Sequence, residues 1–157
     1  MGAHVIALDI SPTRLERSVQ FGAVATLDPS KVDSVGDAIR DLSGGRGVSK
    51  SLETSGASSA ARAALDVLDL WGSVCWVGVG PTINFDLSDH LYRQITAMTS
   101  WTMSIPDMEN CARFVVERRV DVDALFSERW SLGKAKEAYE LFDMQTSGKG
   151  VFVPEGP

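Results

Sequence analysis

Asp9 is the residue whose type and position point most directly to chemistry. It ends a short apolar run at residues 4–9 and is followed closely by Ser11 and Pro12. In a dinucleotide-binding unit, an acidic residue at the tip of the second strand hydrogen-bonds the adenosine ribose of NAD, about 20 residues after a G-x-G-x-x-G turn. Only eight residues precede Asp9 here. We therefore expect the second strand of such a unit, with its first strand and glycine turn not encoded; alternatively, Asp9 only caps the turn at Ser11.

Composition excludes several classes of partner. Hydrophobic residues make up 44% of the 157 and charged residues 23%, with a net charge of −6 and no Lys/Arg stripe. A nucleic-acid surface needs clustered cations, so we expect no nucleic-acid binding. No apolar run approaches the roughly 20 residues that span a bilayer, so we expect no membrane segment. The chain shows no signal-peptide pattern, and its two cysteines lie far apart, which favours a cytoplasmic location.

Short apolar runs alternate with helical patterns along the chain. This alternation is typical of βαβ units and a mostly parallel sheet. Ser11 followed by Pro12 is a helix start, and Gly22 is a helix stop. We expect strands over 4–9, 23–27, 48–54, 73–79, 95–101, 125–130 and 148–153, helices between them including 58–70, and a loop over 82–89.

Four segments together resemble one family. They are GAHVIALDISPTRLERSVQFGA, GGRGVSKSLETSGA, ALDVLDLWGSVCWVGVG and WSLGKAKEAYELFDMQTSGKGVFVP. The chain is similar over nearly its whole length to the cofactor-binding half of medium-chain, zinc-dependent alcohol dehydrogenases. The resemblance implies an α/β fold with an incomplete Rossmann-like, mostly parallel sheet that lacks the first strand, glycine-rich turn and first helix. It implies a truncated dinucleotide-binding domain at 1–104, and an αβ segment at 105–157 that in the family packs back onto the catalytic domain.

The resemblance also implies roles for single residues. Asp9 would bind both ribose hydroxyls and select NAD over NADP, since a carboxylate repels a 2′-phosphate, and Arg14 would lie near the same ribose. The other implied cofactor-binding positions are Thr54 and Ser55 beside the adenosine and bridging phosphates, Val77, Gly78 and Val79 beside the nicotinamide, Ser100, Trp101 and Thr102 as a further nicotinamide contact, and Lys149 toward the pyrophosphate. Residues such as Gly78 could instead simply end a strand.

Catalysis would depend on a domain outside these 157 residues. His4 and His90 have no carboxylate or thiol at ligand spacing, so we expect neither a metal ligand nor a catalytic residue. In the intact enzyme, zinc would polarise the alkoxide and NAD would accept hydride. We expect this chain alone to bind NAD weakly or not at all and to show no turnover. The alternatives are a non-catalytic nucleotide-binding or oligomerising module, or an inactive truncated fragment; a methyltransferase fits the tail less well.

The expected gap in the sheet has three possible outcomes. Without its central strand, the sheet presents two unpaired inner edges, which invite pairing. The Asp9 strand could pair directly with the next strand, a second chain could supply the absent strand, or part of the chain could be disordered. Because the family often dimerises through the strand matching 95–101, we also expect a homodimer through that strand.

Overall fold

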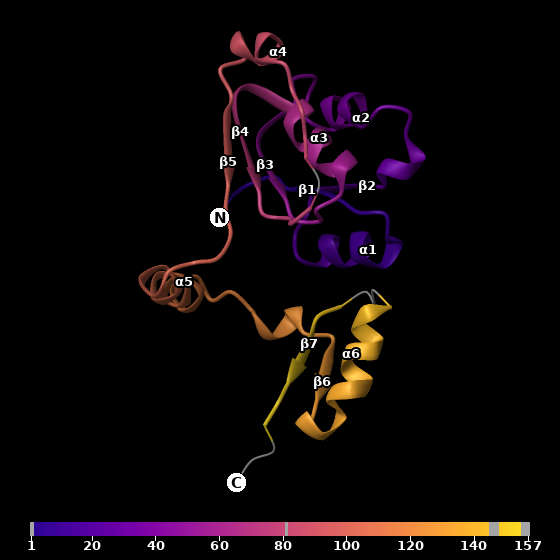
Figure 1. The fold of residues 1–157 in the computed structure, drawn as a ribbon, viewed down its shortest axis with the longest axis vertical. Helices are drawn as coiled ribbons and strands as arrows, with labels where there is room; N and C mark the ends of the chain where they lie inside the picture. The colour runs from indigo at the N-terminus through magenta and orange to yellow at the C-terminus, as the bar shows by residue number, and fades with distance from the viewer. Residues whose placement is uncertain (1, 81, 145–147, 155–157) are drawn as a thin grey trace. The chain divides into compact units, whose positions relative to one another are not determined.

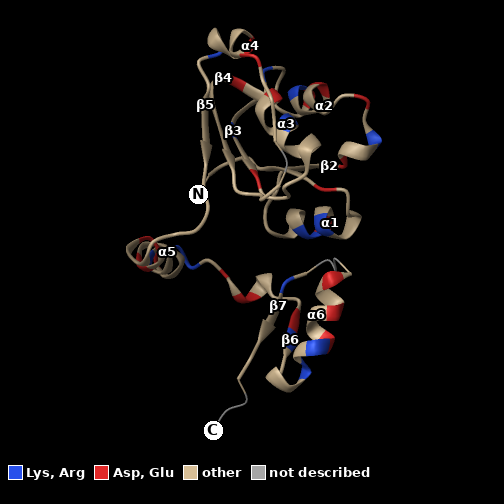
Figure 2. Cartoon of the chain, viewed as in Figure 1, with Lys and Arg blue, Asp and Glu red and all other residues tan. Residues whose placement is uncertain are grey.

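The structure is a computed structural model that describes residues 2–80, 82–144 and 148–154. The chain forms two compact units, Met1–Thr102 and Met103–Pro157 (Figure 1). Acidic and basic side chains are interspersed along both units (Figure 2). In each unit, helices accompany short parallel strands, and the two units are taken in turn.

The first unit begins with a parallel strand pair joined by a helix. Strand β1 (Ile6–Leu8) pairs with β2 (Ala25–Leu27), and α1 (Pro12–Gln20) connects them. The hydroxyl of Ser11 accepts a hydrogen bond from the backbone N–H of Arg14 and so caps α1. The predicted start of this helix is therefore confirmed, because capping signals are local in sequence.

A three-stranded parallel sheet follows, in the order β3-β4-β5. Its core is made of Ala64, Leu65, Leu68 and Val74, against which Trp76 packs. The elements from residue 29 to residue 99 are a 3-10 turn at Pro29–Lys31, α2 (Val35–Leu42), β3 (Val48–Glu53), α3 (Ser58–Asp66), β4 (Leu68–Trp76), α4 (Leu87–Leu91) and β5 (Thr96–Thr99).

Two predicted boundaries around β4 are wrong. The helix expected over 58–70 ends at Asp66, and the strand expected over 73–79 runs from Leu68 to Trp76. The apolar residues between the end of α3 and the middle of β4 are compatible with either a helix or a strand. Because Leu68 pairs with Val48 of β3, they form a strand. The 82–89 segment is not all loop either, since Asp86 caps α4 by accepting from the backbone N–H of Ser88.

The strand pair and the three-stranded sheet remain separate. Among the described residues, β1 pairs only with β2 and β3 only with β4, so direct pairing of the Asp9 strand with the next one is wrong. The strands are parallel, as expected, and the expected gap stays open between the β1-β2 pair and the β3-β4-β5 sheet. Leu52 in β3 is 67% exposed, and Val5 next to β1 is also exposed. Apolar side chains therefore remain uncovered beside the unpaired edges.

In its described residues, the second unit is a parallel strand pair with two α-helices. Strand β6 (Glu128–Trp130) pairs with β7 (Gly150–Phe152). The ring of Tyr139 lies 6.1 Å from that of Phe152. The remaining elements are α5 (Ile105–Arg118), 3-10 turns at Asp123–Leu125 and Leu132–Lys134, and α6 (Ala135–Asp143).

Candidate functional site

The carboxyl ends of β3, β4 and β5 lie in register at one edge of their sheet. Glu53 in β3 is the partner of Trp76 in β4, which is the partner of Thr99 in β5. Ligands of open α/β sheets bind beyond the carboxyl ends of strands. Eight of the predicted residues directly follow these ends. Thr54 and Ser55 follow β3, Val77, Gly78 and Val79 follow β4, and Ser100, Trp101 and Thr102 follow β5. Asp9 has the equivalent position after β1, in the separate strand pair.

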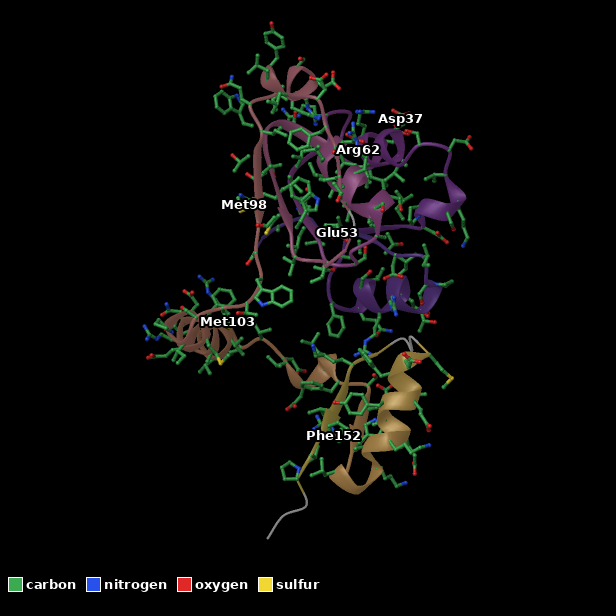
Figure 3. All side chains as sticks on the ribbon, viewed as in Figure 1. Asp37, Glu53, Arg62, Met98, Met103 and Phe152 are labelled. Carbon is green, nitrogen blue, oxygen red and sulfur yellow. The ribbon has the colours of Figure 1, made fainter. Side chains whose placement is uncertain are left out.

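Glu53 organises the first of these strand ends, a role that the sequence analysis missed. The residue is buried, with 5% of it exposed. Figure 3 labels its side chain in the first unit. Its Oε1 accepts hydrogen bonds from the backbone N–H of Ser55 at 2.6 Å, the hydroxyl of Ser55 at 2.5 Å and the backbone N–H of Gly56 at 2.9 Å. Hydrogen bonds to an ionised acceptor are the strong ones. A carboxylate followed by Thr-Ser-Gly was the available signal, since such residues favour turns.

Glycines let the ends of β3 and β4 touch through their backbones. A Cβ atom on Gly78 would lie 2.3 Å from the backbone nitrogen of Gly56, and one on Gly80 would lie 2.3 Å from the Gly56 oxygen. Gly56 itself has φ +73°, a conformation that favours glycine. The backbone N–H groups of Val77 and Gly78 both donate to the carbonyl of Glu53, at 2.8 and 3.2 Å. The two strand ends are therefore one packed substructure.

The third strand end continues the same edge. The backbone N–H of Ser100 donates to the carbonyl of Trp76 at 3.1 Å. Trp101 is 73% exposed, and Ser100 and Thr102 are exposed as well. This segment leaves hydroxyls and an indole ring accessible next to the end of β4.

Asp9 caps its turn, which was one of the two alternatives, and keeps acceptor positions that its observed contacts do not use. Its Oδ1 accepts from the backbone N–H of Ser11 at 2.8 Å, so it does cap the turn. Its Oδ2 lies 3.6 Å from Nη1 of Arg14, and the Asp9 side chain is 29% exposed. Because a carboxylate offers about four acceptor positions, these two contacts leave room for ribose hydroxyls. The geometry fits NAD at this position.

Lys149 lies in the second unit, whereas the other ten predicted residues lie in the first. Its backbone carbonyl accepts from the N–H of Ser127 at 3.0 Å, and its side chain is exposed.

Zinc does not fit the described part of the chain, where no three His, Cys, Asp or Glu side chains converge. Over residues 2–80, 82–144 and 148–154, no helix is long and apolar enough to cross a membrane.

Comparison with protein families identifies the chain. The family described as zinc-binding dehydrogenase matches residues 1–117. The chain belongs to this family.

Relatives among known proteins agree with the assignment. The zinc-type alcohol dehydrogenase-like protein YphC of Escherichia coli is 28% identical over 149 residues, covering 94% of this chain and 42% of YphC. D-xylulose reductase of Saccharomyces cerevisiae is 26% identical, covering 99% of this chain and 45% of the reductase. The chain thus spans less than half the length of these relatives.

Solved structures show the same fold. The alcohol dehydrogenase TADH from Thermus sp. ATN1 superposes with a TM-score of 0.87 at 24% identity, covering 98% of this chain and 44% of TADH. Benzyl alcohol dehydrogenase from Acinetobacter calcoaceticus gives a TM-score of 0.84 at 23% identity, with 98% and 44% covered. The two units therefore match the cofactor-binding portion of alcohol dehydrogenases in fold.

Proposed function

We propose that the chain is the NAD(H)-binding portion of a zinc-dependent alcohol or polyol dehydrogenase. The observation that carries this proposal is the common edge formed by the ends of β3, β4 and β5, where Glu53 and three glycines pack two strand ends together. The family assignment and the likeness to alcohol dehydrogenases support it.

Each residue predicted to bind the cofactor has a proposed role. Asp9, held by Arg14, accepts hydrogen bonds from the adenosine ribose. Thr54 and Ser55 lie beside the adenosine and bridging phosphates, Val77, Gly78 and Val79 beside the nicotinamide, Ser100, Trp101 and Thr102 at the next nicotinamide contact, and Lys149 toward the pyrophosphate. These residues bind and orient, while the bound nicotinamide supplies the hydride chemistry. The described residues provide no zinc ligand set, so no step through zinc is assigned to them.

We propose that these 157 residues alone bind the cofactor weakly. They contain no G-x-G-x-x-G sequence. That turn and the helix after it hold the pyrophosphate through backbone N–H groups. Without that turn, the pyrophosphate lacks several charge-assisted hydrogen bonds, each worth about 1.5–3 kcal/mol. Their loss weakens the affinity for NAD by about a thousandfold or more. We expect millimolar binding or weaker, and no turnover.

The test is a titration with NADH and, in parallel, NADPH, followed by tryptophan fluorescence. We expect saturable quenching by NADH in the millimolar range and weaker quenching by NADPH. In Asp9→Asn, we expect NADH and NADPH to quench equally. Asp28→Asn is a matched control, because Asp28 also follows a strand, caps a turn at Ser30 and pairs with Lys31 at 3.1 Å. Equal response to the two cofactors, or an equal effect of both variants, contradicts the role of Asp9.

A homodimer through β5 is a second part of the proposal. Strand β5 is the outer strand of its sheet, and all four of its residues are exposed. A strand with an unpaired edge is a template for pairing with another chain. The family's habit of dimerising through this strand supports the same surface.

A further inference from the structure

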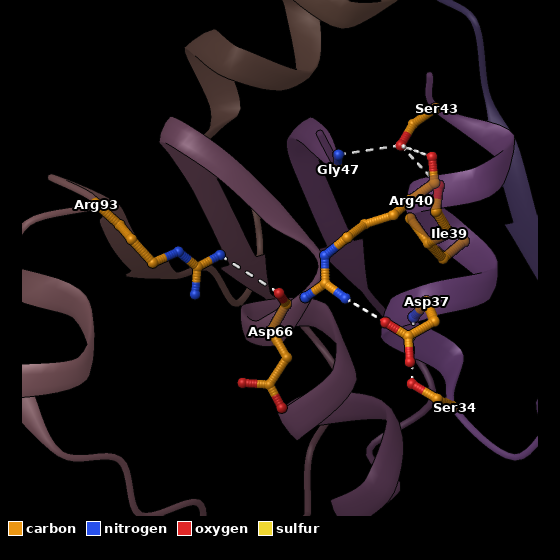
Figure 4. A network of polar contacts seen from close by, with 8 residues as sticks. All are labelled: Ser34, Asp37, Ile39, Arg40, Ser43, Gly47, Asp66 and Arg93. Atoms are coloured by element: carbon orange, nitrogen blue, oxygen red, sulfur yellow. Dashed lines mark hydrogen bonds and ion pairs between the residues drawn. The ribbon is translucent and has the colours of Figure 1, made fainter. Parts of the chain in front are cut away.

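A cleft of about 630 Å³ lies between α2, α3 and the segment that precedes β5. Asp66 and Arg93, which line it, come immediately before β4 and shortly before β5. They therefore lie toward the amino ends of these strands, whereas the proposed NAD site follows the carboxyl ends. Figure 4 shows part of this cleft, with Arg93 and Arg40 entering it from opposite sides.

Three guanidinium groups from three different elements line the cleft, those of Arg40, Arg62 and Arg93. Arg40 pairs with Asp37 at 2.6 Å. Arg62 pairs with Asp66 at 2.8 Å and donates to the carbonyl of Asn84 at 3.0 Å. Each guanidinium carries five N–H donors, so these contacts leave donors to spare.

Arg93 fixes the hydrogen-bonding state of a buried histidine. Its Nη2 donates to the backbone carbonyls of Asp66 and Leu68, and its Nη1 lies 3.3 Å from Nδ1 of His90. A guanidinium only donates, so a hydrogen bond between these two groups makes Nδ1 of His90 the acceptor and places the ring N–H on Nε2. His90 is 6% exposed, and within the described chain its Nε2 has no hydrogen-bond partner. A buried donor without an acceptor is costly, and an incoming oxygen atom relieves that cost.

The other charged and polar groups of the cleft restrict which ligands it can bind. Asp66 and Asp89 also line it, and with Asp37 they offset the charge of the three arginines. The first residues of α2 line it too, and the start of a helix favours an anion. A ligand that combines an oxyanion with hydroxyl groups matches both the N–H donors and the carboxylates of the cleft. The oxyanion accepts hydrogen bonds from the N–H donors, and the hydroxyls donate to the carboxylates.

We propose that this cleft binds a small phosphate monoester that also carries hydroxyl groups, such as a sugar phosphate. Arg40, Arg62 and the Nε2–H of His90 donate to the phosphate, and Asp66 and Asp89 accept from the hydroxyls. Arg93 is a positioning residue, since it orients His90 and holds the end of α3.

The test is a titration with glucose 6-phosphate followed by the ring nitrogen resonances of the two histidines. His4 is exposed and distant in sequence, so it reports non-specific effects of ionic strength. We expect a saturable shift of the His90 Nε2 signal at millimolar ligand and no shift for His4. We expect glucose to give no shift and inorganic phosphate to bind more weakly than glucose 6-phosphate. A parallel shift of both histidines, no saturation, or inorganic phosphate equal to glucose 6-phosphate overturns the proposal.

Variants locate the binding. Arg40→Gln and Arg62→Gln should each weaken affinity about tenfold, the loss of one or more charge-assisted hydrogen bonds. Arg113→Gln is a matched control, because Arg113 pairs with Glu109 at the same i,i+4 spacing as Arg62 with Asp66, but on α5. If Arg40→Gln and Arg62→Gln leave the affinity for glucose 6-phosphate unchanged, the ligand binds elsewhere. The same conclusion follows if Arg113→Gln weakens it equally. The outcome is independent of NAD binding, since no cofactor is present.

Discussion

Gly78 lies directly against the buried carboxylate of Glu53: a Cβ atom on Gly78 would stand 2.6 Å from Oε2 of Glu53. The same atom would lie 2.3 Å from the backbone nitrogen of Gly56. Real Cβ atoms do not approach backbone this closely, so a side chain at position 78 must push the ends of β3 and β4 apart. The glycine is therefore part of the packing that aligns the two strand ends.

Gly78→Ala should destabilise the first unit by about 1–3 kcal/mol, the usual cost of overpacking. The change is best measured by amide hydrogen exchange at Val77 and Gly56, whose positions report this junction directly. Gly133→Ala is the control, because a Cβ there would meet only Ser131 Oγ, at 3.9 Å. Unchanged exchange rates in Gly78→Ala would show that the junction is looser than its backbone contacts indicate.

Glu53→Gln should cost about 2 kcal/mol of stability, since an amide replaces an ionised acceptor that serves two backbone N–H groups and a hydroxyl. Urea unfolding of the chain, with amide exchange at Ser55 and Gly56, measures this loss. Glu109→Gln removes a carboxylate from the exposed ion pair with Arg113 and should change stability by less than about 0.5 kcal/mol. Equal effects of the two variants would contradict the organising role of Glu53.

Local signals predicted some elements well, and long-range contacts decided the rest. The start of α1 depends on the adjacent residues Ser11 and Pro12, so the sequence was sufficient to find it. The start of β4 depends on Val48, 20 residues earlier than Leu68, and no pattern within the 64–72 stretch contains that information. The burial of Glu53 likewise depends on Gly56 and Gly78 folding over it.

The candidate site shows the same division. Asp9 was found from its place after an apolar run, and its turn-capping contact was one of the two expected alternatives. His90 follows the segment that was expected to be a loop, but it lies in α4 and is buried. Its partner Arg93 and the cleft that they line arise from the meeting of three elements separated in sequence, which periodicity does not reveal.

Acidification should release α4 through Asp86. The hydrogen bond from the backbone N–H of Ser88 is the largest of the causes that hold the pKa of Asp86 below its usual value of 3.8, and the hydroxyl of Ser88 acts in the same direction. A carboxyl with a lowered pKa in the folded state stabilises the fold above its unfolded-state pKa, and this contribution is lost as the pH falls through the folded-state value. We therefore expect the amide of Ser88 to lose protection only below about pH 4.

Asp86→Asn should remove that pH dependence, because asparagine keeps an acceptor oxygen but does not titrate. Asp28→Asn is the control: the hydroxyl of Ser30 and the ammonium of Lys31 lower the pKa of Asp28 too, but its turn is separate from α4. Carboxyl carbon shifts followed from pH 2 to pH 6 measure both groups. A pH-independent Ser88 amide in the unmodified chain would contradict the expected role of the Asp86 cap.

The final prediction concerns dimerisation through β5. Met98 lies in this outer strand and is exposed, so Met98→Lys places like charges close together wherever two β5 edges pair. Like charges directly opposite in a sheet are destabilising. We expect sedimentation to show a concentration-dependent dimer for the unmodified chain and a monomer for Met98→Lys. Met108→Lys adds the same charge at an exposed position on α5 and should leave the dimer intact. If the unmodified chain stays monomeric up to about millimolar concentration, then β5 pairing contributes less than about 4 kcal/mol, and the edge is not an interface between copies of this chain.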